Sequence, residues 1–182
     1  MLTLILGGAR SGKSRYAQSL CAGTFAIYVA TAKVADDDIE MAHRIARHRG
    51  DRPSQWRTIE EPLRVVEVVR KLASDALVIV DCVTVWISNL QEQYASRSSE
   101  ERETAILAAV ADFVEATRGR DVIVVTNDVG SGIVPMHPVA REFRDLQGLA
   151  NQFLAGQADA VALLVAGLPV VLKGSAPQRL GA

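Results

Sequence analysis

The sequence predicts an α/β fold in which helices flank a mostly parallel sheet. Two observations support this prediction. Short, nearly continuous apolar runs alternate with longer stretches of helical periodicity, a pattern typical of strands that are covered on both faces. The first apolar run leads directly into a glycine-rich segment and then into a helix, as in proteins that bind phosphate groups.

Six apolar runs are interpreted as strands. Five are short and rich in Val, Ile and Leu, and the sixth begins at a proline, which suits an edge strand. In chain order, the predicted strands are Leu2–Leu6, Ala26–Ala30, Leu77–Val80, Val122–Thr126, Val161–Val165 and Pro169–Lys173.

Five intervening stretches are interpreted as helices. Their start signals are an Asp-rich first turn, the first-turn position of Pro62, and Ser99, which we expect to cap the longest helix before Gly119 ends it. The predicted helices are Lys13–Cys21, Asp37–His48, Pro62–Leu72, Ser99–Arg118 and Pro138–Gly156. This alternation predicts right-handed crossovers between parallel strands.

The composition is that of an ordinary globular protein. Of 182 residues, 49% are hydrophobic and 23% charged, and the net charge of -1 gives no basic field for nucleic acid. The longest apolar run, Ala160–Leu172, is shorter than the roughly 20 residues of a membrane span. Two distant cysteines and the lack of a visible targeting signal favour the cytoplasm. We expect one nucleotide-binding domain over residues 1–174 and a flexible tail at 175–182.

Residues 7–14 carry the strongest functional signal. They read GGARSGKS and match the phosphate-loop pattern G-x-x-x-x-G-K-[ST]. We expect Lys13 to neutralise the β- and γ-phosphates catalytically and Ser14 to bind Mg²⁺. A chance glycine-rich turn is the alternative. The expected nucleotide-binding residues of the loop are Gly7, Gly8, Ala9, Arg10, Ser11, Gly12, Lys13 and Ser14.

Asp81 follows the apolar strand Leu77–Val80, and this is the pattern of a carboxylate that lies near Mg²⁺ in phosphate-loop proteins. Asp81 is therefore the second expected metal ligand, although an aspartate at a strand end can also be a turn residue or a helix cap. Loop and aspartate together predict a P-loop nucleotide-binding protein. They do not predict the reaction, because kinases, motors, switches and transferases share them.

Two further segments are more specific. Residues 44–60 contain R-I-x-x-H-R, then RP and W-x-T-x-E, and residues 129–135 read VGSGIVP. With the phosphate loop and the segments 81–90 and 141–174, they make nearly the whole chain resemble one P-loop family. This is the bifunctional adenosylcobinamide kinase / adenosylcobinamide-phosphate guanylyltransferase family of cobalamin biosynthesis.

The resemblance implies a RecA-like fold, a homotrimer and two reactions. ATP or GTP phosphorylates the aminopropanol hydroxyl of adenosylcobinamide. GTP then gives GMP to an enzyme histidine and releases pyrophosphate, and the phosphorylated cobinamide takes the GMP to form adenosylcobinamide-GDP. The implied partners are adenosylcobinamide and its phosphate, with GTP and ATP as substrates and Mg²⁺ as cofactor.

The nucleophile of the family corresponds to His48, by match to R-I-x-x-H-R. A neutral imidazole nitrogen can attack a phosphorus atom, and an ordinary pKa near 6.5 leaves the ring mostly neutral at pH 7. A histidine that merely ends a helix is the alternative. His43 lies on a different face of the predicted helix, and an exposed loop residue is the simpler interpretation of His137.

Further nucleotide contacts are expected near His48 and at neighbouring strand ends. Arginine suits phosphate oxygens through its planar fork, although a solvated basic loop is the alternative. Glu60 resembles a nucleotide-contacting glutamate of the family, or else it is a helix-start residue. For Trp56 and Trp86, core packing is simpler than stacking on a base or corrin. The expected contacts outside the loop are Ala32, Lys33, Val34, Arg49, Gly50, Asp51, Arg52, Glu60 and Asp81.

Two other functions stay open on the residues alone. One is a simple P-loop small-molecule kinase without a covalent intermediate. The other is a non-enzymatic RecA-like module that binds nucleotide and a partner. A covalent GMP adduct on the protein distinguishes the bifunctional enzyme from both.

Overall fold

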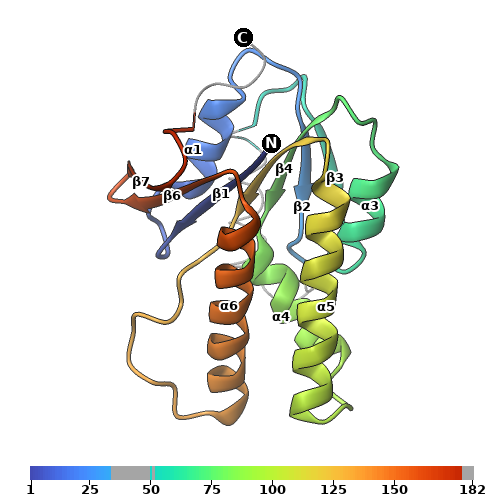
Figure 1. Cartoon of the computed structure of the whole chain (residues 1–182), viewed down its shortest axis with the longest axis vertical. Coiled ribbons are helices and arrows are strands. Elements are labelled where there is room, and N and C mark those ends of the chain that lie inside the picture. The colour runs from blue at the N-terminus through green and yellow to red at the C-terminus, as the bar shows by residue number, and fades with distance from the viewer. Residues whose placement is uncertain (34–49, 51, 178–182) are drawn as a thin grey trace.

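A seven-stranded sheet forms the centre of the computed structural model, which describes residues 1–33, 50 and 52–177 (Figure 1). The strand order is β3-β2-β4-β5-β1-β6-β7, and every neighbouring pair is parallel except β6 with β7. The predicted mostly parallel sheet is therefore confirmed. The strands are β1 Leu2–Gly7, β2 Ile27–Ala30, β3 Arg57–Glu60, β4 Leu77–Asp81, β5 Asp121–Val125, β6 Ala160–Val165 and β7 Leu168–Lys173.

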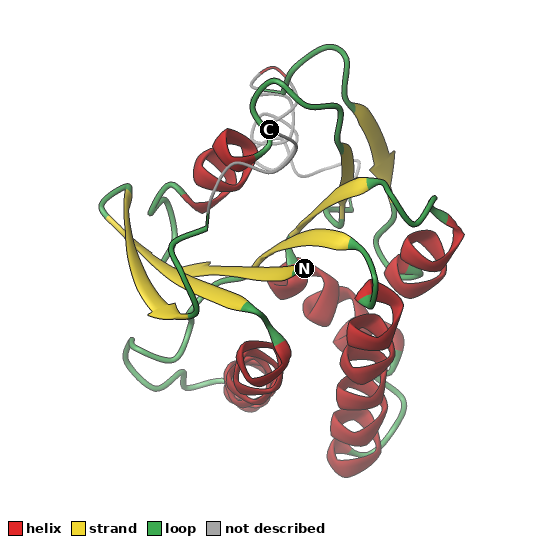
Figure 2. Cartoon of the chain, turned by 45° about the horizontal axis from the view of Figure 1, so that its top comes forward, coloured by secondary structure: helices red, strands yellow, loops and turns green. Residues whose placement is uncertain are grey.

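Helices cover both faces of the sheet (Figure 2). One face packs against α1 through a buried cluster that includes Ile5, Ala17 and Ile79. The other face packs against the remaining helices through a larger cluster. Alternate residues of β1, β2, β4 and β5 enter the two clusters, as the period of two requires. The described helices are α1 Lys13–Leu20, α3 Val65–Lys71, α4 Val83–Gln93, α5 Ser99–Thr117 and α6 Pro138–Gln157.

Both tryptophans belong to the core, as the simpler interpretation predicted. Trp86 is 1% exposed, its ring lies 5.7 Å from that of Phe113, and its indole N–H donates to the Leu63 carbonyl at 2.8 Å. Trp56 is also buried and donates to the Thr24 carbonyl at 2.9 Å. A buried ring with a satisfied N–H stabilises the fold and is not available for stacking on a base or corrin.

One predicted helix start and one predicted capping residue were wrong. The third predicted helix begins at Val65 and not at Pro62, because Glu61 Oε1 accepts the N–H groups of Leu63 and Arg64 at 3.0 and 2.9 Å and holds a turn there. The long helix α5 is capped by Ser98 and not by Ser99. Ser98 and Glu101 form a reciprocal capping box that satisfies two otherwise unpaired N–H groups.

Helix α4 was missed, because its sequence Val-Thr-Val-Trp-Ile is rich in residues that favour strands. Packing overrides this preference, since Trp86, Ile87 and Leu90 all enter the larger core cluster. The predicted helix Asp37–His48 and the end of the predicted tail, 178–182, lie outside the described residues. Among the helices that are described, none is long and apolar enough to cross a membrane.

Candidate functional site

The segment between β1 and α1 closes tightly on itself, and two glycines make this geometry possible. Gly7 has φ +152°, and a side chain there would place its Cβ 2.6 Å from both the Leu164 carbonyl oxygen and Ser11 Oγ. Gly12, directly before α1, has φ +96° and lies against Gly167. Only glycine adopts such angles at little cost. The path of the backbone therefore explains why the motif has glycine at positions 7 and 12. The loop ends at the N-terminus of α1, where free N–H groups favour an anion.

Lys13 is the first residue of α1 and points back over the loop. Its side chain is 7% exposed, and Nζ donates to the Gly8 carbonyl at 2.6 Å and to Ser11 Oγ at 3.4 Å. A lysine amine held against the loop, at the N-terminus of a helix, concentrates positive charge at one point. This arrangement suits the β- and γ-phosphates of a nucleotide.

The hairpin turn between β6 and β7 supports the phosphate loop from behind. Gly167 N donates to the Ser11 carbonyl at 2.9 Å, and a Cβ on Gly12 would lie 3.3 Å from Gly167 Cα. Ala166 and Gly167 both have positive φ, which suits a two-residue hairpin turn. The antiparallel hairpin of β6 and β7 therefore holds the phosphate loop in place.

Asp81 lies at the carboxyl end of β4. The phosphate loop leaves the carboxyl end of β1, so both lie along the edge of the sheet that the carboxyl ends of the parallel strands form. Tyr28 of β2 donates a short hydrogen bond from its hydroxyl to Asp81 Oδ2. Burial, followed by the negative charge of Asp81, raises the pKa of Tyr28 well above its usual value, so the hydroxyl stays protonated and donates. One oxygen of the Asp81 carboxylate is thereby oriented.

Lys13 and Asp81 face the same corner of the structure. Burial and the charge of Asp81 raise the pKa of the Cys82 thiol to about 12, and the positive charge of Lys13 acts in the opposite direction. In the register of the sheet, Val125 of β5 pairs with both Ile5 of β1 and Asp81 of β4, so the loop that follows β1 and the end of β4 lie at the same end of neighbouring strands. The sequence-predicted pair is therefore brought together, although β5 lies between β1 and β4 in the sheet.

The ends of β2 and β4 are fastened by the buried residue Thr31. Its Oγ1 accepts from Cys82 N at 2.9 Å and donates to the Cys82 carbonyl at 2.8 Å. Asn89 of α4 donates to the Thr31 and Pro62 carbonyls, each at 2.9 Å. The backbone around Asp81 is thus held by side chains of neighbouring elements.

Arg52 lies over the ring of Tyr28. Its guanidinium carbon is 3.8 Å from the ring centroid, which is a cation–π geometry, and its NH1 donates to Thr58 Oγ1 at 3.2 Å. This arginine, expected from sequence to contact nucleotide, therefore lies one side chain away from Asp81. Sequence analysis missed Tyr28; the available signal was a tyrosine inside a buried strand beside β4.

The remaining predicted contacts are distributed along the same edge. Glu60 is exposed at the end of β3, where Ala30 pairs with both Glu60 and Asp81 in the register of the sheet. Lys33 is exposed, with Nζ 3.8 Å from Glu92 Oε2. Ala32 is half-buried and Gly50 exposed. Val34, His48, Arg49 and Asp51 lie outside the described residues.

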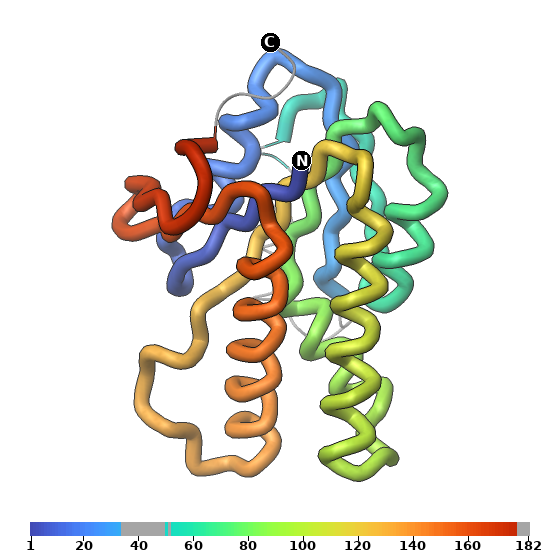
Figure 3. Tube along the Cα trace, viewed as in Figure 1, coloured from blue at the N-terminus to red at the C-terminus, as the bar shows by residue number. Residues whose placement is uncertain are grey.

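The loop between β5 and α6 also begins at this edge and makes a wide arc (Figure 3). Asp128 N donates to the Gly7 carbonyl at 3.1 Å. Asn151 Nδ2 donates to the Asn127 carbonyl at 2.9 Å, and Thr84 Oγ1 accepts from Asn127 N at 2.8 Å. The loop is therefore anchored beside the phosphate loop. His137 at its end is exposed, as the simpler interpretation predicted.

The donor atoms at the site fit Mg²⁺. Ser14 and Asp81 offer hard oxygen ligands, and Mg²⁺ on a nucleotide takes only one or two protein ligands beside phosphates and water. Within residues 1–33, 50 and 52–177, no cluster of three or more His, Cys, Asp or Glu could hold a metal ion. A metal at this site therefore depends on the nucleotide for most of its ligands.

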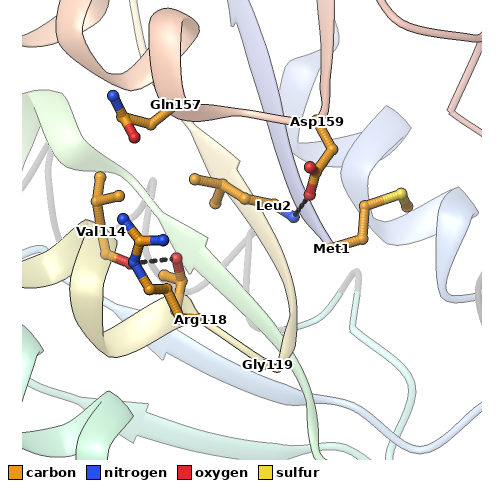
Figure 4. Close-up of a pocket in the computed structure, with 8 residues that line it drawn as sticks. Met1, Leu2, Val114, Arg118, Gly119, Gln157 and Asp159 are labelled. Atoms are coloured by element: carbon orange, nitrogen blue, oxygen red, sulfur yellow. Dashed lines mark hydrogen bonds between the residues drawn. The ribbon is translucent and has the colours of Figure 1, made fainter.

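Two hollows lie at the opposite edge of the sheet. One of about 300 Å³ is lined by residues that include Met1, Arg118 and Asp159, and Asp159 Oδ2 accepts from Leu2 N at 2.7 Å (Figure 4). The other, of about 430 Å³, lies beside Phe25 and Asp75. Ligands of open α/β sheets bind at the carboxyl ends of the strands, so these hollows do not compete with the phosphate loop as the active site.

Comparison with known proteins agrees with this geometry. The model of the cobinamide kinase / cobinamide phosphate guanyltransferase family matches residues 3–172. A bifunctional adenosylcobalamin biosynthesis protein, CobP of Pseudomonas aeruginosa, is 43% identical over 178 residues, which cover 96% of this chain and 98% of that protein. CobU of Escherichia coli, also a bifunctional adenosylcobalamin biosynthesis protein, is 39% identical over 183 residues, 95% of this chain and 100% of that protein.

Among solved structures, an ATPase from the type III secretion system of pathogenic bacteria is similar in fold, with a TM-score of 0.54. The match covers 93% of this chain and 56% of that chain, and its 12% sequence identity shows the fold alone. The predicted RecA-like P-loop fold is confirmed.

Substitution of Lys13 by alanine tests the phosphate loop. We expect Lys13→Ala to slow turnover of GTP and ATP by roughly 10²–10³-fold, the loss typical of one charge-stabilising donor. Circular dichroism should show an intact fold, because the amine faces the loop and not the core. Lys71→Ala, at an exposed position of α3, is the matched control. Wild-type turnover by a folded Lys13→Ala protein would contradict the assignment.

Proposed function

This chain belongs to the cobinamide kinase / cobinamide phosphate guanyltransferase family, and we propose that it catalyses both reactions on adenosylcobinamide. ATP or GTP phosphorylates the aminopropanol hydroxyl, and GTP then supplies GMP to give adenosylcobinamide-GDP and pyrophosphate. The observation that carries this proposal is the phosphate loop and Asp81 at the same end of the parallel strands, in a chain that matches the family over nearly its whole length.

In the kinase step, the substrate hydroxyl oxygen attacks the γ-phosphorus and the bond to the nucleoside diphosphate breaks. Catalysis of this step is mainly positioning and charge stabilisation. The N–H groups of the loop and Lys13 hold the phosphates, while Ser14 and Asp81 hold the cation. When Mg²⁺ is bound, it neutralises negative charge on the β- and γ-phosphate oxygens.

In the guanylyl transfer, a nitrogen of His48 attacks the α-phosphorus of GTP. The phosphorus–oxygen bond to pyrophosphate breaks, and the imidazole loses its proton, which leaves GMP on the ring. A phosphate oxygen of the phosphorylated cobinamide then displaces His48. Support comes from the motif around His48 and from Arg52, four residues along the chain, which lies over Tyr28 beside Asp81.

The other expected contacts form the rest of the proposed nucleotide site. Arg52, like Arg49, suits phosphate oxygens. Glu60 is exposed at the carboxyl end of β3, where a carboxylate can accept the N–H groups of a guanine edge. The family match and the use of nucleoside triphosphates favour the cytoplasm as the compartment.

The corrinoid is a large substrate with extensive apolar surface, and exposed apolar side chains occur in the loop between β5 and α6, which starts beside the phosphate loop at Asp128. In the anchored loop between β5 and α6, Ile133 is 98% exposed and Met136 95% exposed. Single exposed apolar residues need no explanation, but several of them in one loop that starts beside the phosphate loop do. We assign this loop to contact with adenosylcobinamide.

A His48→Asn variant tests the two-step mechanism. Kinase activity should persist, because phosphorylation of a hydroxyl needs no covalent intermediate. Guanylyl transfer should fail, because the asparagine amide is not a nucleophile. The measurement is incubation with α-labelled GTP and Mg²⁺, followed by denaturing electrophoresis. Label on the wild type should be labile in acid and stable in base, as expected for phosphorus bound to nitrogen.

The chain has three histidines, so the control set is complete. His43→Asn and His137→Asn should label normally. A normal adduct on His48→Asn, or loss of label only in His43→Asn, would overturn the assignment. An active wild type that never becomes labelled would instead indicate direct transfer or a simple kinase.

We also propose that the protein is a homotrimer, as the family resemblance implies. Strand β7 supports self-association, since it is an edge strand whose apolar side chains, among them Leu168 and Leu172, are 70% and 58% exposed. An exposed apolar edge normally needs a cover, and a head-to-tail contact that closes at three chains provides one. Sedimentation equilibrium should give the mass of three chains. A monomer at micromolar concentration would contradict this proposal.

A further inference from the structure

Tyr28 touches both a metal-site carboxylate and a positively charged group, through different parts of its side chain. The hydroxyl donates to Asp81 Oδ2, and the ring lies under the guanidinium of Arg52. We propose that Tyr28 is a positioning residue that orients Asp81 toward the Mg²⁺ of the bound nucleotide and holds Arg52 beside it. This inference rests on the proposed nucleotide site.

The position of Tyr28 in the sheet explains how one residue reaches both groups. Tyr28 pairs with Ile79 across β2 and β4, and both enter the core cluster on the α1 side. Asp81 follows Ile79 by two residues, so its side chain leaves the strand on the same face. The long tyrosine ring spans the intervening distance, and the hydroxyl meets the carboxylate at the end of the strand.

The hydroxyl is the part of Tyr28 that packing does not require. The side chain is 1% exposed, and a phenylalanine would fill almost the same volume among the apolar neighbours. A hydroxyl in such surroundings must be paired, and its partner is the carboxylate of Asp81. Holding Oδ2 prevents free rotation of the carboxylate and leaves Oδ1 to face the cation or one of its waters. Such supporting hydrogen bonds commonly set the affinity of a metal site.

Arg52 adds a second, independent observation. Its Nε is buried and has no hydrogen-bond partner among residues 1–33, 50 and 52–177, while its NH1 is held by Thr58 Oγ1. A buried donor without an acceptor is costly unless something fills the position, and a phosphate oxygen is the acceptor that an arginine fork fits. The ring of Tyr28 keeps this guanidinium in place.

The test compares nucleotide affinity with and without metal. The ligand is the α,β-methylene analogue of GTP, in which carbon replaces the oxygen that His48 would displace, and the method is calorimetry in Mg²⁺ or in EDTA. Mg²⁺ should raise the affinity of Tyr28→Phe for the analogue by roughly tenfold less than it raises that of the wild type, which is the lower end of the effect of losing a supporting hydrogen bond. The affinity of Tyr28→Phe in EDTA should equal that of the wild type. A residue with only a structural role would weaken binding equally in both conditions.

Tyr94→Phe is the matched control. Tyr94 also carries an arginine over its ring, with Arg97 at 4.2 Å, and it follows α4 roughly 16 Å along the helix from Asp81. This variant should bind like the wild type. Arg52→Gln should weaken binding in Mg²⁺ and EDTA alike, because its proposed partner is phosphate and not the metal.

A double variant shows whether Tyr28 acts through Asp81. Asp81→Asn should abolish most of the Mg²⁺ gain, and adding Tyr28→Phe should then change it no further. A full Mg²⁺ gain in Tyr28→Phe, an equal loss in EDTA, or additive losses in the double variant would overturn the proposal. A wild type with no Mg²⁺ gain would overturn it together with the metal role of Asp81. Failure of the guanylyl adduct to form leaves this measurement unaffected.

Discussion

The parallel pairing of β1, β2, β4 and β5 is the constraint on which the site depends. Parallel strands all end at one edge, so the residues that follow them meet there whatever their separation in the chain. The phosphate loop after β1 and Asp81 at the end of β4 are more than 60 residues apart in sequence, yet Ile5 of β1 and Asp81 both pair with Val125 of β5. No local motif brings the amine of Lys13 and the carboxylate of Asp81 to one corner of the structure. The parallel sheet does so, because their strands end at the same edge.

Supporting contacts turn this edge into a defined site. The β6–β7 turn fixes the phosphate loop through Gly167 and Ser11, and Thr31 fastens Cys82. Tyr28 orients Asp81 from within the core layer. These contacts come from β2 and Thr31 beside β4 and from the β6–β7 turn beside β1, so both parts of the site are held by groups outside them. Groups that are held in place in this way can stabilise charge in the transition state with little reorganisation.

Much of this arrangement could be predicted from sequence, and the failures have physical causes. The spacing of Gly7, Gly12 and Lys13 is local, and a local backbone path dictates it, so the phosphate loop was found. Helix α4 was missed because β-branched residues favour strands until tertiary packing of residues such as Trp86 decides otherwise. Tyr28 was missed for a related reason. Its role appears only when β2 is placed beside β4, and no spacing within one strand reveals that neighbour.

The most direct test is a crystal structure with Mg²⁺ and the α,β-methylene analogue of GTP. Our interpretation predicts that the phosphates lie against the N–H groups of Gly8–Ser14, with the cation between Ser14 Oγ and Asp81 Oδ1. Tyr28 should still donate to Asp81 Oδ2, and Arg52 should reach a phosphate oxygen. Nucleotide bound at the opposite edge of the sheet, or a cation bound away from Asp81, would contradict the proposed site.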